Sequence, residues 1–270
     1  MLSIIIPTLN EEKCLPRLLR DLSRQIYRDF EVIVVDGGSS DKTVKLARSF
    51  SPSLPRLTVT FSPRPHVCHQ RNLGVKTAKG KILMFMDADS RLDPEFLLGA
   101  RYRWETSQAE VLSFWFKPDI INTRNESIAL AVNLFRELQN NLNPRYLLEA
   151  LFMIKKDRFL AAGGFDESIN YAEGSQLIRT LVKQGNVSKI VRDPVFTFSF
   201  RRLRQMGLLT MAGTMARLEL SNLIGKNYQS FVAKKIYPMV GGSQFRYNQK
   251  AKNQFVIKIK KLLMDLDRDF

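Results

Sequence analysis

Short apolar runs alternate with amphipathic segments along the first half of the chain, and this alternation limits the possible folds more than any other feature. The clearest runs are residues 3–6, 31–35, 57–61 and 81–86. The segment after the first run carries Leu15, Leu18 and Leu22 at helical spacing. Such an order is typical of βαβ units. We therefore predict an α/β fold with a mostly parallel central sheet flanked by helices.

The remaining elements follow from the same patterns. Residues 81–86 are apolar on both faces, which predicts a central strand. Pro7 is expected to close the first strand and Asn10 to cap the following helix. Further helices are predicted over 70–77, 127–138 and 175–183, and further strands over 111–116 and 196–200. We expect a catalytic domain over residues 1–200 and a basic, helical C-terminal extension over 201–270.

The charge of the chain is concentrated in this extension. The formal net charge is +16, and residues 200–270 contain 14 Lys and Arg but four Asp and Glu. This asymmetry indicates an anionic partner, either nucleic acid or the headgroups of a membrane. A basic face that is merely solvated is the simpler alternative. Of the two partners we favour an anionic membrane surface over nucleic acid.

Apolar side chains are interleaved with the basic ones in the extension. Residues 206–216 are apolar but fall short of the roughly 20 residues that a spanning helix needs. Residues 255–263 alternate lysines with large aliphatic side chains. Both segments suit helices that lie on a membrane surface, and both would equally suit helices packed on the catalytic domain.

The two cysteines, Cys14 and Cys68, have neither a paired spacing nor a cluster with histidine. We therefore expect no disulfide framework and no zinc site. The first residues form a predicted strand at once, without the pattern of a secretory signal. These features favour a cytoplasmic protein that is peripheral at the cytosolic face of a membrane.

Acidic side chains follow three of the predicted strands. Glu11 follows the first strand, Asp36 ends the second, and Asp87 and Asp89 end the central one. In an open parallel sheet, ligands bind outside the carboxyl ends of the strands, so these groups are expected to converge on one crevice. Each could instead be an ordinary turn former. Their recurrence on successive strands favours a site.

The sequence Asp87-Ala88-Asp89 is the most informative of these groups. Two carboxylates separated by one small residue can face the same point and offer hard oxygen ligands to Mg²⁺ or Mn²⁺. The remaining coordination positions would take phosphate oxygens. A divalent cation there would neutralise the charge that develops on a diphosphate leaving group.

Five blocks in this order resemble the family 2 glycosyltransferases of GT-A fold. The blocks are residues 4–12, 34–41, 71–74, 87–89 and 163–167. The resemblance extends over about residues 1–190 and implies a GT-A type nucleotide-binding fold. It further implies an inverting transfer of a sugar from a UDP- or GDP-sugar to a hydroxyl acceptor. The basic extension suggests that this acceptor is lipid-linked.

The resemblance also implies roles for individual residues. Pro7, Glu11 and Asp36 would line the nucleotide pocket, with Asp36 accepting a hydrogen bond from the base. Arg71 would approach the diphosphate or ribose, Asp87 the ribose or sugar, and Asp89 the metal, with Asp87 as a second ligand. The full set expected around the donor is Pro7, Thr8, Asn10, Glu11, Asp36, Gly38, Arg71, Asp87 and Ala88.

Two positions depart from the family pattern. Gly37 follows Asp36 where a second aspartate is frequent, and Glu173-Gly174 stands where a Glu-Asp pair supplies the catalytic base. Glu173 is our first candidate for the base, with Asp166 and Glu167 as fallbacks. Glu173 could instead only favour the start of a helix electrostatically, which would leave a protein that binds a donor without turning it over.

We predict a glycosyltransferase that uses Mn²⁺ or Mg²⁺, a nucleotide-diphosphate sugar donor, and a sugar or polyprenyl-phosphate acceptor. A sugar-phosphate nucleotidyltransferase is an alternative, although this chain lacks the Gly-rich, Arg-containing opening loop of those enzymes. A nucleic-acid-binding module that uses the basic extension is another. The sequence indicates neither the donor base and sugar nor the oligomeric state.

Overall fold

The structure is a computed structural model that describes residues 1–144, 147–169 and 173–208, together with residues 210, 211, 213 and 214. Its strands are β1 (Leu2–Thr8), β2 (Phe30–Asp36), β3 (Leu57–Phe61), β4 (Ile82–Met86), β5 (Val111–Pro118), β6 (Leu151–Lys155) and β7 (Ser188–Phe198). Its helices are α1 (Leu15–Ser23), α2 (Thr43–Arg48), α3 (Val67–Thr77), α4 (Phe96–Ser107), α5 (Thr123–Leu142), α6 (Lys156–Ala161), α7 (Glu173–Lys183) and α8 (Arg201–Met206).

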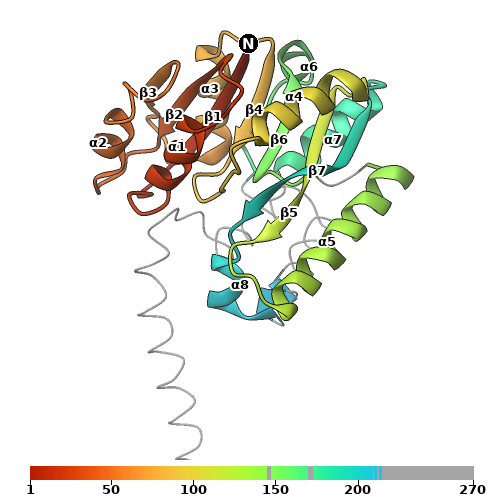
Figure 1. The fold of residues 1–270 in the computed structure, drawn as a ribbon. Coiled ribbons are helices and arrows are strands. Elements are labelled where there is room, and N and C mark those ends of the chain that lie inside the picture. The colour runs from red at the N-terminus through yellow and green to blue at the C-terminus, as the bar shows by residue number, and fades with distance from the viewer. Residues whose placement is uncertain (145–146, 170–172, 209, 212, 215–270) are drawn as a thin grey trace, which may run out of the picture.

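The strands form one sheet of seven in the order β3-β2-β1-β4-β6-β5-β7 (Figure 1). Neighbouring strands are parallel except at β6, which is antiparallel to both β4 and β5. The predicted α/β fold with a mostly parallel sheet is thereby confirmed. The reversal at β6 has a consequence for function, because the residues that precede β6 lie at the same edge as the carboxyl end of β4.

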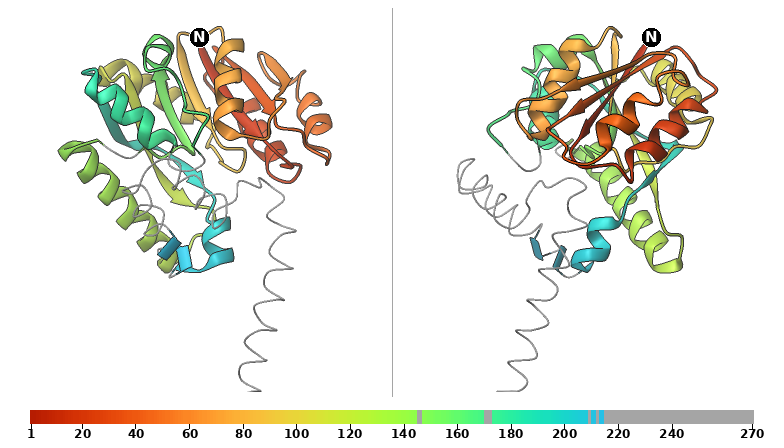
Figure 2. Two further views of the ribbon diagram at one scale, coloured as in Figure 1. Left: turned by 180° about the vertical axis from the view of Figure 1, so that it is seen from behind. Right: turned by 90° about the vertical axis from the view of Figure 1, so that its left-hand side faces the viewer.

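Helices cover both faces of the sheet, so that helices, sheet and helices form three layers (Figures 1 and 2). Side chains of α1, α2, α4 and α5 pack on one face, against residues such as Ile4 and Met84. Side chains of α3, α6 and α7 pack on the other, against residues such as Ile5 and Phe85. Alternate residues of each central strand therefore enter different cores, which explains why these strands are apolar on both faces.

Helix α3 lies especially close to the sheet, at Gly74. A Cβ atom at this position would come within 2.5 Å of Ile5 Cγ2. Only glycine lets the helix backbone approach β1 this closely. The close approach brings the preceding turn of α3, and Arg71 with it, into the buried interior.

Several predicted boundaries differ from the observed ones. Pro7 does not close β1, which continues to Thr8. Asn10 does not cap a helix, because it adopts a left-handed φ of 55° and α1 begins only at Leu15. The strand predicted over 196–200 is the second half of β7, which begins at Ser188.

Only the first residues of the predicted extension, those of α8 and a few beyond it, fall within the described part of the chain. The segment at 255–263 and residues 209, 212, 215 and 216 of the segment at 206–216 lie outside the described residues. None of the described helices combines the length and the apolar run that crossing a bilayer requires.

Candidate active site

The loop after β2 is organised by the carboxylate of Asp36. This side chain is 2% exposed, and its Oδ2 accepts hydrogen bonds from the backbone N–H groups of Gly38 (3.0 Å) and Ser39 (2.8 Å). Its Oδ1 accepts a bond from the hydroxyl of Thr8 at 3.1 Å, which ties the ends of β1 and β2 together. Gly38 has a φ of 93°, which suits glycine. In this structure the Asp36 carboxylate accepts hydrogen bonds from its own loop and from Thr8. The hydrogen bond predicted between Asp36 and the nucleotide base stays a prediction.

Asn10 joins the same two loops. Its backbone N–H donates to Ser39 Oγ at 2.8 Å, and its side-chain Oδ1 accepts from the backbone N–H of Ser40 at 2.8 Å. These bonds account for the left-handed conformation of Asn10, which asparagine tolerates better than most residues. Asn10 therefore shapes the loop that carries Glu11 into the site.

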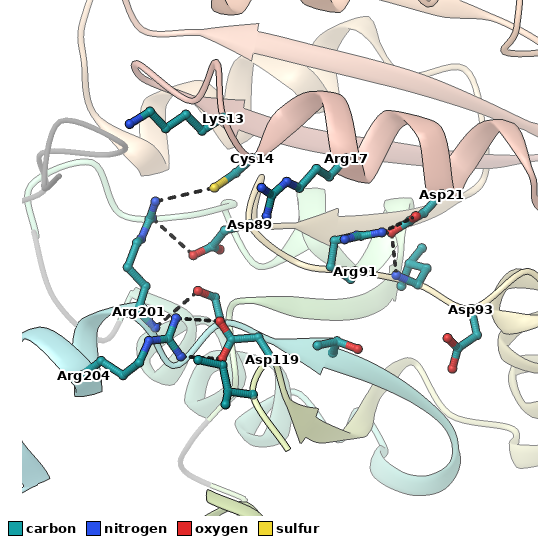
Figure 3. A pocket seen from close by; sticks show the side chains of 14 residues that line it. Lys13, Cys14, Arg17, Asp21, Asp89, Arg91, Asp93, Asp119, Arg201 and Arg204 are labelled. Atoms are coloured by element: carbon teal, nitrogen blue, oxygen red, sulfur yellow. Dashed lines mark hydrogen bonds and ion pairs between the residues drawn. The ribbon is translucent and has the colours of Figure 1, made fainter. Parts of the chain in front are cut away.

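Glu11 and Asp89 meet at the guanidinium of Arg201, the first residue of α8. Figure 3 shows the contact between Arg201 and Asp89. Arg201 Nη2 lies 3.4 Å from Glu11 Oε1 and 3.2 Å from Asp89 Oδ2. Burial raises the pKa of Glu11 to about 7, with the charge of Arg201 opposing this rise and that of Asp89 adding to it. The three groups bring together the carboxyl ends of β1 and β4 and the start of the C-terminal segment.

A cavity of about 610 Å³ opens beside this cluster (Figure 3). Its walls carry charges of both signs and come from α1 and the residues before it, from the segments after β4 and β5, and from β7 and α8. The charged residues include Lys13, Arg17, Asp89, Arg91, Asp119, Arg201 and Arg204. Some of these charges are paired, as in the two contacts of 2.6 and 2.7 Å between Arg204 and Asp119. Asp36 lies at the same edge of the sheet but does not line this cavity.

Asp87 and Asp89 turn toward different partners. Ala88 between them is 4% exposed and packs into the core, which explains why a small residue separates the two carboxylates. Asp87 Oδ1 accepts a hydrogen bond of 2.9 Å from Arg71 Nη2. Desolvation raises the pKa of Asp87 to about 6, with Arg71 opposing and Asp89 and Glu149 adding to the rise. The pair thus divides between the clusters around Arg71 and Arg201.

Arg71 is buried rather than turned toward a phosphate. It is 2% exposed, its guanidinium lies 5.2 Å from the ring centre of Phe165, and it also donates to the backbone carbonyl of Glu149 at 3.2 Å. Its Nη1 is 3.8 Å from Glu149 Oε2. In this structure Arg71 contacts the acidic side chains of Asp87 and Glu149. Its predicted contact with a diphosphate or ribose stays a prediction.

Glu149 is the acidic residue that the sequence analysis missed. It comes directly before β6, and its Oε1 accepts a bond of 2.6 Å from the backbone N–H of Gly174 at the start of α7. Glu173 is adjacent and 1% exposed. Burial and the neighbouring Glu173 raise the pKa of Glu149 well above its usual range, with Arg71 opposing. An acidic residue before a strand became informative only once that strand was known to be antiparallel.

The fallback bases hold the turn before α7. Asp166 accepts hydrogen bonds from the backbone N–H of Ser168 (2.9 Å) and from Gln176 Nε2 (3.1 Å). Glu167 contacts His69 Nδ1 at 2.9 Å and accepts a bond of 3.0 Å from Asn72 Nδ2. These partners explain the position of both carboxylates without a catalytic role, which stays a prediction for each.

Comparison with known proteins identifies the family. A family model described as glycosyl transferase family 2 matches residues 3–159. The chain belongs to this family. Among curated family relatives, a Mycobacterium tuberculosis PGL/p-HBAD biosynthesis glycosyltransferase is 44% identical over 93 residues, which are 34% of this chain and 36% of that protein. An uncharacterized glycosyltransferase of Haemophilus influenzae is 29% identical over 73% of this chain and 64% of its own length.

Solved structures show the same fold. The mannosyltransferase PcManGT of Pyrobaculum calidifontis, in complex with GDP-Man and Mn²⁺, has a TM-score of 0.65 at 22% identity, over 83% of this chain and 62% of that one. Residues 1–349 of TarS from S. aureus, in complex with UDP-GlcNAc, give a TM-score of 0.64 at 22% identity, over 83% of this chain and 65% of that one. These likenesses confirm the GT-A fold. The chain spans less than two thirds of the length of these relatives.

Proposed function

We propose that this protein transfers a sugar from a nucleoside diphosphate donor to an acceptor hydroxyl, with inversion at the anomeric carbon. The observation that carries the proposal is the meeting of Glu11 and Asp89, from the ends of β1 and β4, at one cationic group beside a cavity. The same edge of the sheet carries Asp36 and Asp87. Family membership and the nucleotide complexes of the structural neighbours support a UDP- or GDP-sugar as donor.

The residues present fit a divalent cation that takes most of its ligands from the substrate. The described residues contain no cluster of three or more His, Cys, Asp or Glu side chains that could hold a metal by themselves. Asp89 and Glu11 nevertheless share a cation already, the guanidinium of Arg201. Mg²⁺ and Mn²⁺ are commonly held by one or two carboxylates together with substrate phosphates.

When bound, such a cation would supply Lewis-acid stabilisation of the leaving diphosphate. Asp89 would hold it, with Asp87 or Glu11 as the second carboxylate. Arg201 would then exchange its carboxylate partners for phosphate oxygens, to which a guanidinium is well suited. Arg71 would keep Asp87 in place, and the loop held by Asp36 would form the floor of the nucleotide site.

The variant Asp89→Asn tests this function. Transfer from a panel of UDP- and GDP-sugars should fall by about 100-fold or more, since the variant loses the carboxylate that would hold the cation beside the leaving group. The thermal shift that UDP or GDP causes with Mn²⁺ should shrink, because ligand-induced stabilisation follows affinity. Asp93→Asn, on the rim of the same cavity, is the matched control. Undiminished transfer by Asp89→Asn would reject the metal assignment.

For the acceptor we propose a lipid-linked or lipid-embedded hydroxyl, on the evidence of α5. The outward face of this helix carries Leu130, Leu134, Phe135, Leu138 and Leu142, which are 46–78% exposed. Its inward face carries Asn133, Arg136 and Asn140, which are buried and donate hydrogen bonds to carbonyls of β5 and β7. Surface helices ordinarily show the reverse arrangement, and exposed apolar patches mark interaction sites.

The apolar face is adjacent to the cavity. Ile120, just before α5, lines the cavity, and Ile121 beside it is 71% exposed. An acceptor could thus place its head group near Lys13 and Arg17 at the cavity rim while its chain stays in a bilayer that contacts α5. Basic groups near anionic lipid contribute about 1 kcal/mol each to such binding.

Flotation with anionic liposomes tests the membrane part of the proposal. Replacing Leu134 and Leu138 with Ser should reduce the bound fraction several-fold, because it removes exposed apolar area. The matched control replaces Leu98 and Tyr102, which are exposed on α4, with Ser. Equal binding by both double variants would show that α5 does not contact the lipid.

A further inference from the structure

Gly174 stands where the family pattern has its catalytic aspartate, and the structure shows what occupies the space of the missing side chain. A Cβ atom at Gly174 would come within 2.6 Å of Glu149 Cγ, 3.0 Å of its Oε1 and 3.2 Å of its Cδ. The volume into which an aspartate at 174 would extend is therefore filled by Glu149. The two side chains exclude each other.

The backbone does not demand glycine at this position. Gly174 lies in the first turn of α7 without a positive φ, unlike Gly163 and Gly164 before it. Glycine inside a helix is destabilising relative to alanine. The glycine is thus explained by the close approach of Glu149, whose Oε1 accepts the Gly174 N–H at 2.6 Å.

The topology of the sheet brings Glu149 to the site. Leu151 of β6 pairs with Met86, the last residue of β4, and the N–H of Asp87 donates to the carbonyl of Ala150 at 2.9 Å. Glu149 therefore lies beside Asp87, at the edge where the donor is expected. Arg71 contacts both residues, with 2.9 Å to Asp87 Oδ1 and 3.8 Å to Glu149 Oε2.

Exposure separates the two candidate carboxylates. The side chain of Glu149 is 21% exposed, whereas Glu173 is 1% exposed and lies beneath it. A general base must reach the hydroxyl proton to within hydrogen-bond distance. Of these two residues, only Glu149 is open to an acceptor.

We propose that Glu149 is the general base of this enzyme and that Gly174 makes room for it. This inference rests on the proposed sugar transfer. The acceptor oxygen forms its bond to the anomeric carbon as the bond from that carbon to the diphosphate oxygen breaks. The electron pair of the broken bond stays on the leaving nucleoside diphosphate. The acceptor proton passes to the Glu149 carboxylate and from there to water.

The surrounding groups orient this carboxylate. The Gly174 N–H holds Oε1, and Arg71 lies on the side of Oε2. Glu173 places a second carboxyl group close to Glu149. The sequence suggested Glu173 as the general base, and we assign this role instead to Glu149, which lies close to it.

The first test is the isosteric variant Glu149→Gln, whose amide oxygen can still accept the Gly174 N–H. We expect kcat to fall by about 100-fold or more, which is the usual contribution of a general base. KM for the donor and the thermal shift with UDP or GDP and Mn²⁺ should change less than about threefold, because donor binding does not need a base. Retention of more than a third of wild-type kcat by Glu149→Gln would overturn the proposal.

The second test moves the carboxylate back to position 174. Glu149→Ala alone should be as slow as Glu149→Gln, and the double variant Glu149→Ala/Gly174→Asp should regain at least about tenfold in kcat, since the aspartate enters the vacated space. The control Glu149→Ala/Gly174→Ala should regain nothing. Gly174→Asp alone should lower the melting temperature because of the clash with Glu149 Cγ.

The outcomes separate this inference from the proposed function. Wild-type protein that shows neither transfer nor a nucleotide-induced thermal shift would count against the proposed function itself. Wild-type transfer that survives in Glu149→Gln but disappears in Glu173→Gln would reject Glu149 as the base and leave the sugar transfer standing.

Discussion

Two arginines organise the acidic groups of the candidate active site, and they do so in different ways. Arg71 is 2% exposed, and its partners Asp87 and Glu149 flank the central strands β4 and β6. Arg201 is 14% exposed and reaches Glu11 and Asp89 from α8, after the last strand of the sheet. The first is part of the core, and the second is brought by the C-terminal segment.

This difference indicates which of the two guanidinium groups can exchange its carboxylate partners for a ligand. Removing Arg71 from its position would require breaking the packing of α3 on β1, where Gly74 contacts Ile5. Arg201 lies at the start of a short helix, and its Nη2 is 3.2–3.4 Å from its carboxylate partners. We therefore expect a substrate that carries a metal ion and phosphates to replace the contacts of Arg201, and we expect the Arg71 cluster to stay as a fixed support.

The largest effect is expected for Arg71→Leu. This variant leaves Asp87 and Glu149 near each other without their counterion, and loss of one partner from a buried ion pair costs about 3–5 kcal/mol. Urea unfolding measures this loss, with Arg103→Leu on α4 as a surface control. A loss below about 1 kcal/mol would show that Arg71 is not a structural support and would remove the contrast with Arg201.

A smaller, pH-dependent effect is expected for Glu11→Gln. The pKa of Glu11 rises from 4.5 to about 7 in the folded state because of burial. The folded state therefore binds this proton more tightly than the unfolded chain does. As the pH rises from about 4.5 to about 7, the unfolded chain loses the proton first, and the free energy of unfolding decreases. Since one pKa unit corresponds to about 1.4 kcal/mol, the difference between the two pKa values limits the effect to about 3.5 kcal/mol.

Glutamine cannot ionise, so Glu11→Gln should gain stability relative to the wild type as the pH is raised from 5 to 8. Melting temperatures recorded in the presence of a chelator measure this trend, and Glu105→Gln on the outer face of α4 is the control. If the melting temperatures of variant and wild type differed by the same amount at pH 5 and at pH 8, protonation of Glu11 would not be linked to folding.

The smallest effect on stability is expected for Arg201→Ala, which should lower the free energy of unfolding by about 1–2 kcal/mol. The contacts of Arg201 are partly exposed, and a hydrogen bond to a charged group contributes stability on this scale. The variant should also weaken the binding of UDP or GDP with Mn²⁺ by about tenfold, as measured by calorimetry. Arg204→Ala on the same helix, which pairs with Asp119, is the matched control. A stability loss as large as that of Arg71→Leu would place both arginines in the core.

The sequence by itself determined the elements and the edge of the sheet at which the site lies. Alternating apolar runs fixed β1, β2 and β4, and the acidic residues after them marked the carboxyl edge. Such information is local, because burial on two faces and turn chemistry leave their pattern in consecutive residues. The family blocks likewise lie within single strand ends and turns, so Asp36, Asp87 and Asp89 could be found without coordinates.

Only the tertiary structure decided which of these groups meet. The reversed direction of β6 places Glu149 beside Asp87, and the path of the chain after β7 brings Arg201 to Glu11. Neither contact leaves a local pattern, because each joins residues that are distant in sequence and depends on how the strands are ordered in the sheet. Whether Gly174 marks a lost catalytic group or makes room for one follows from a single contact, that between its backbone and the side chain of Glu149.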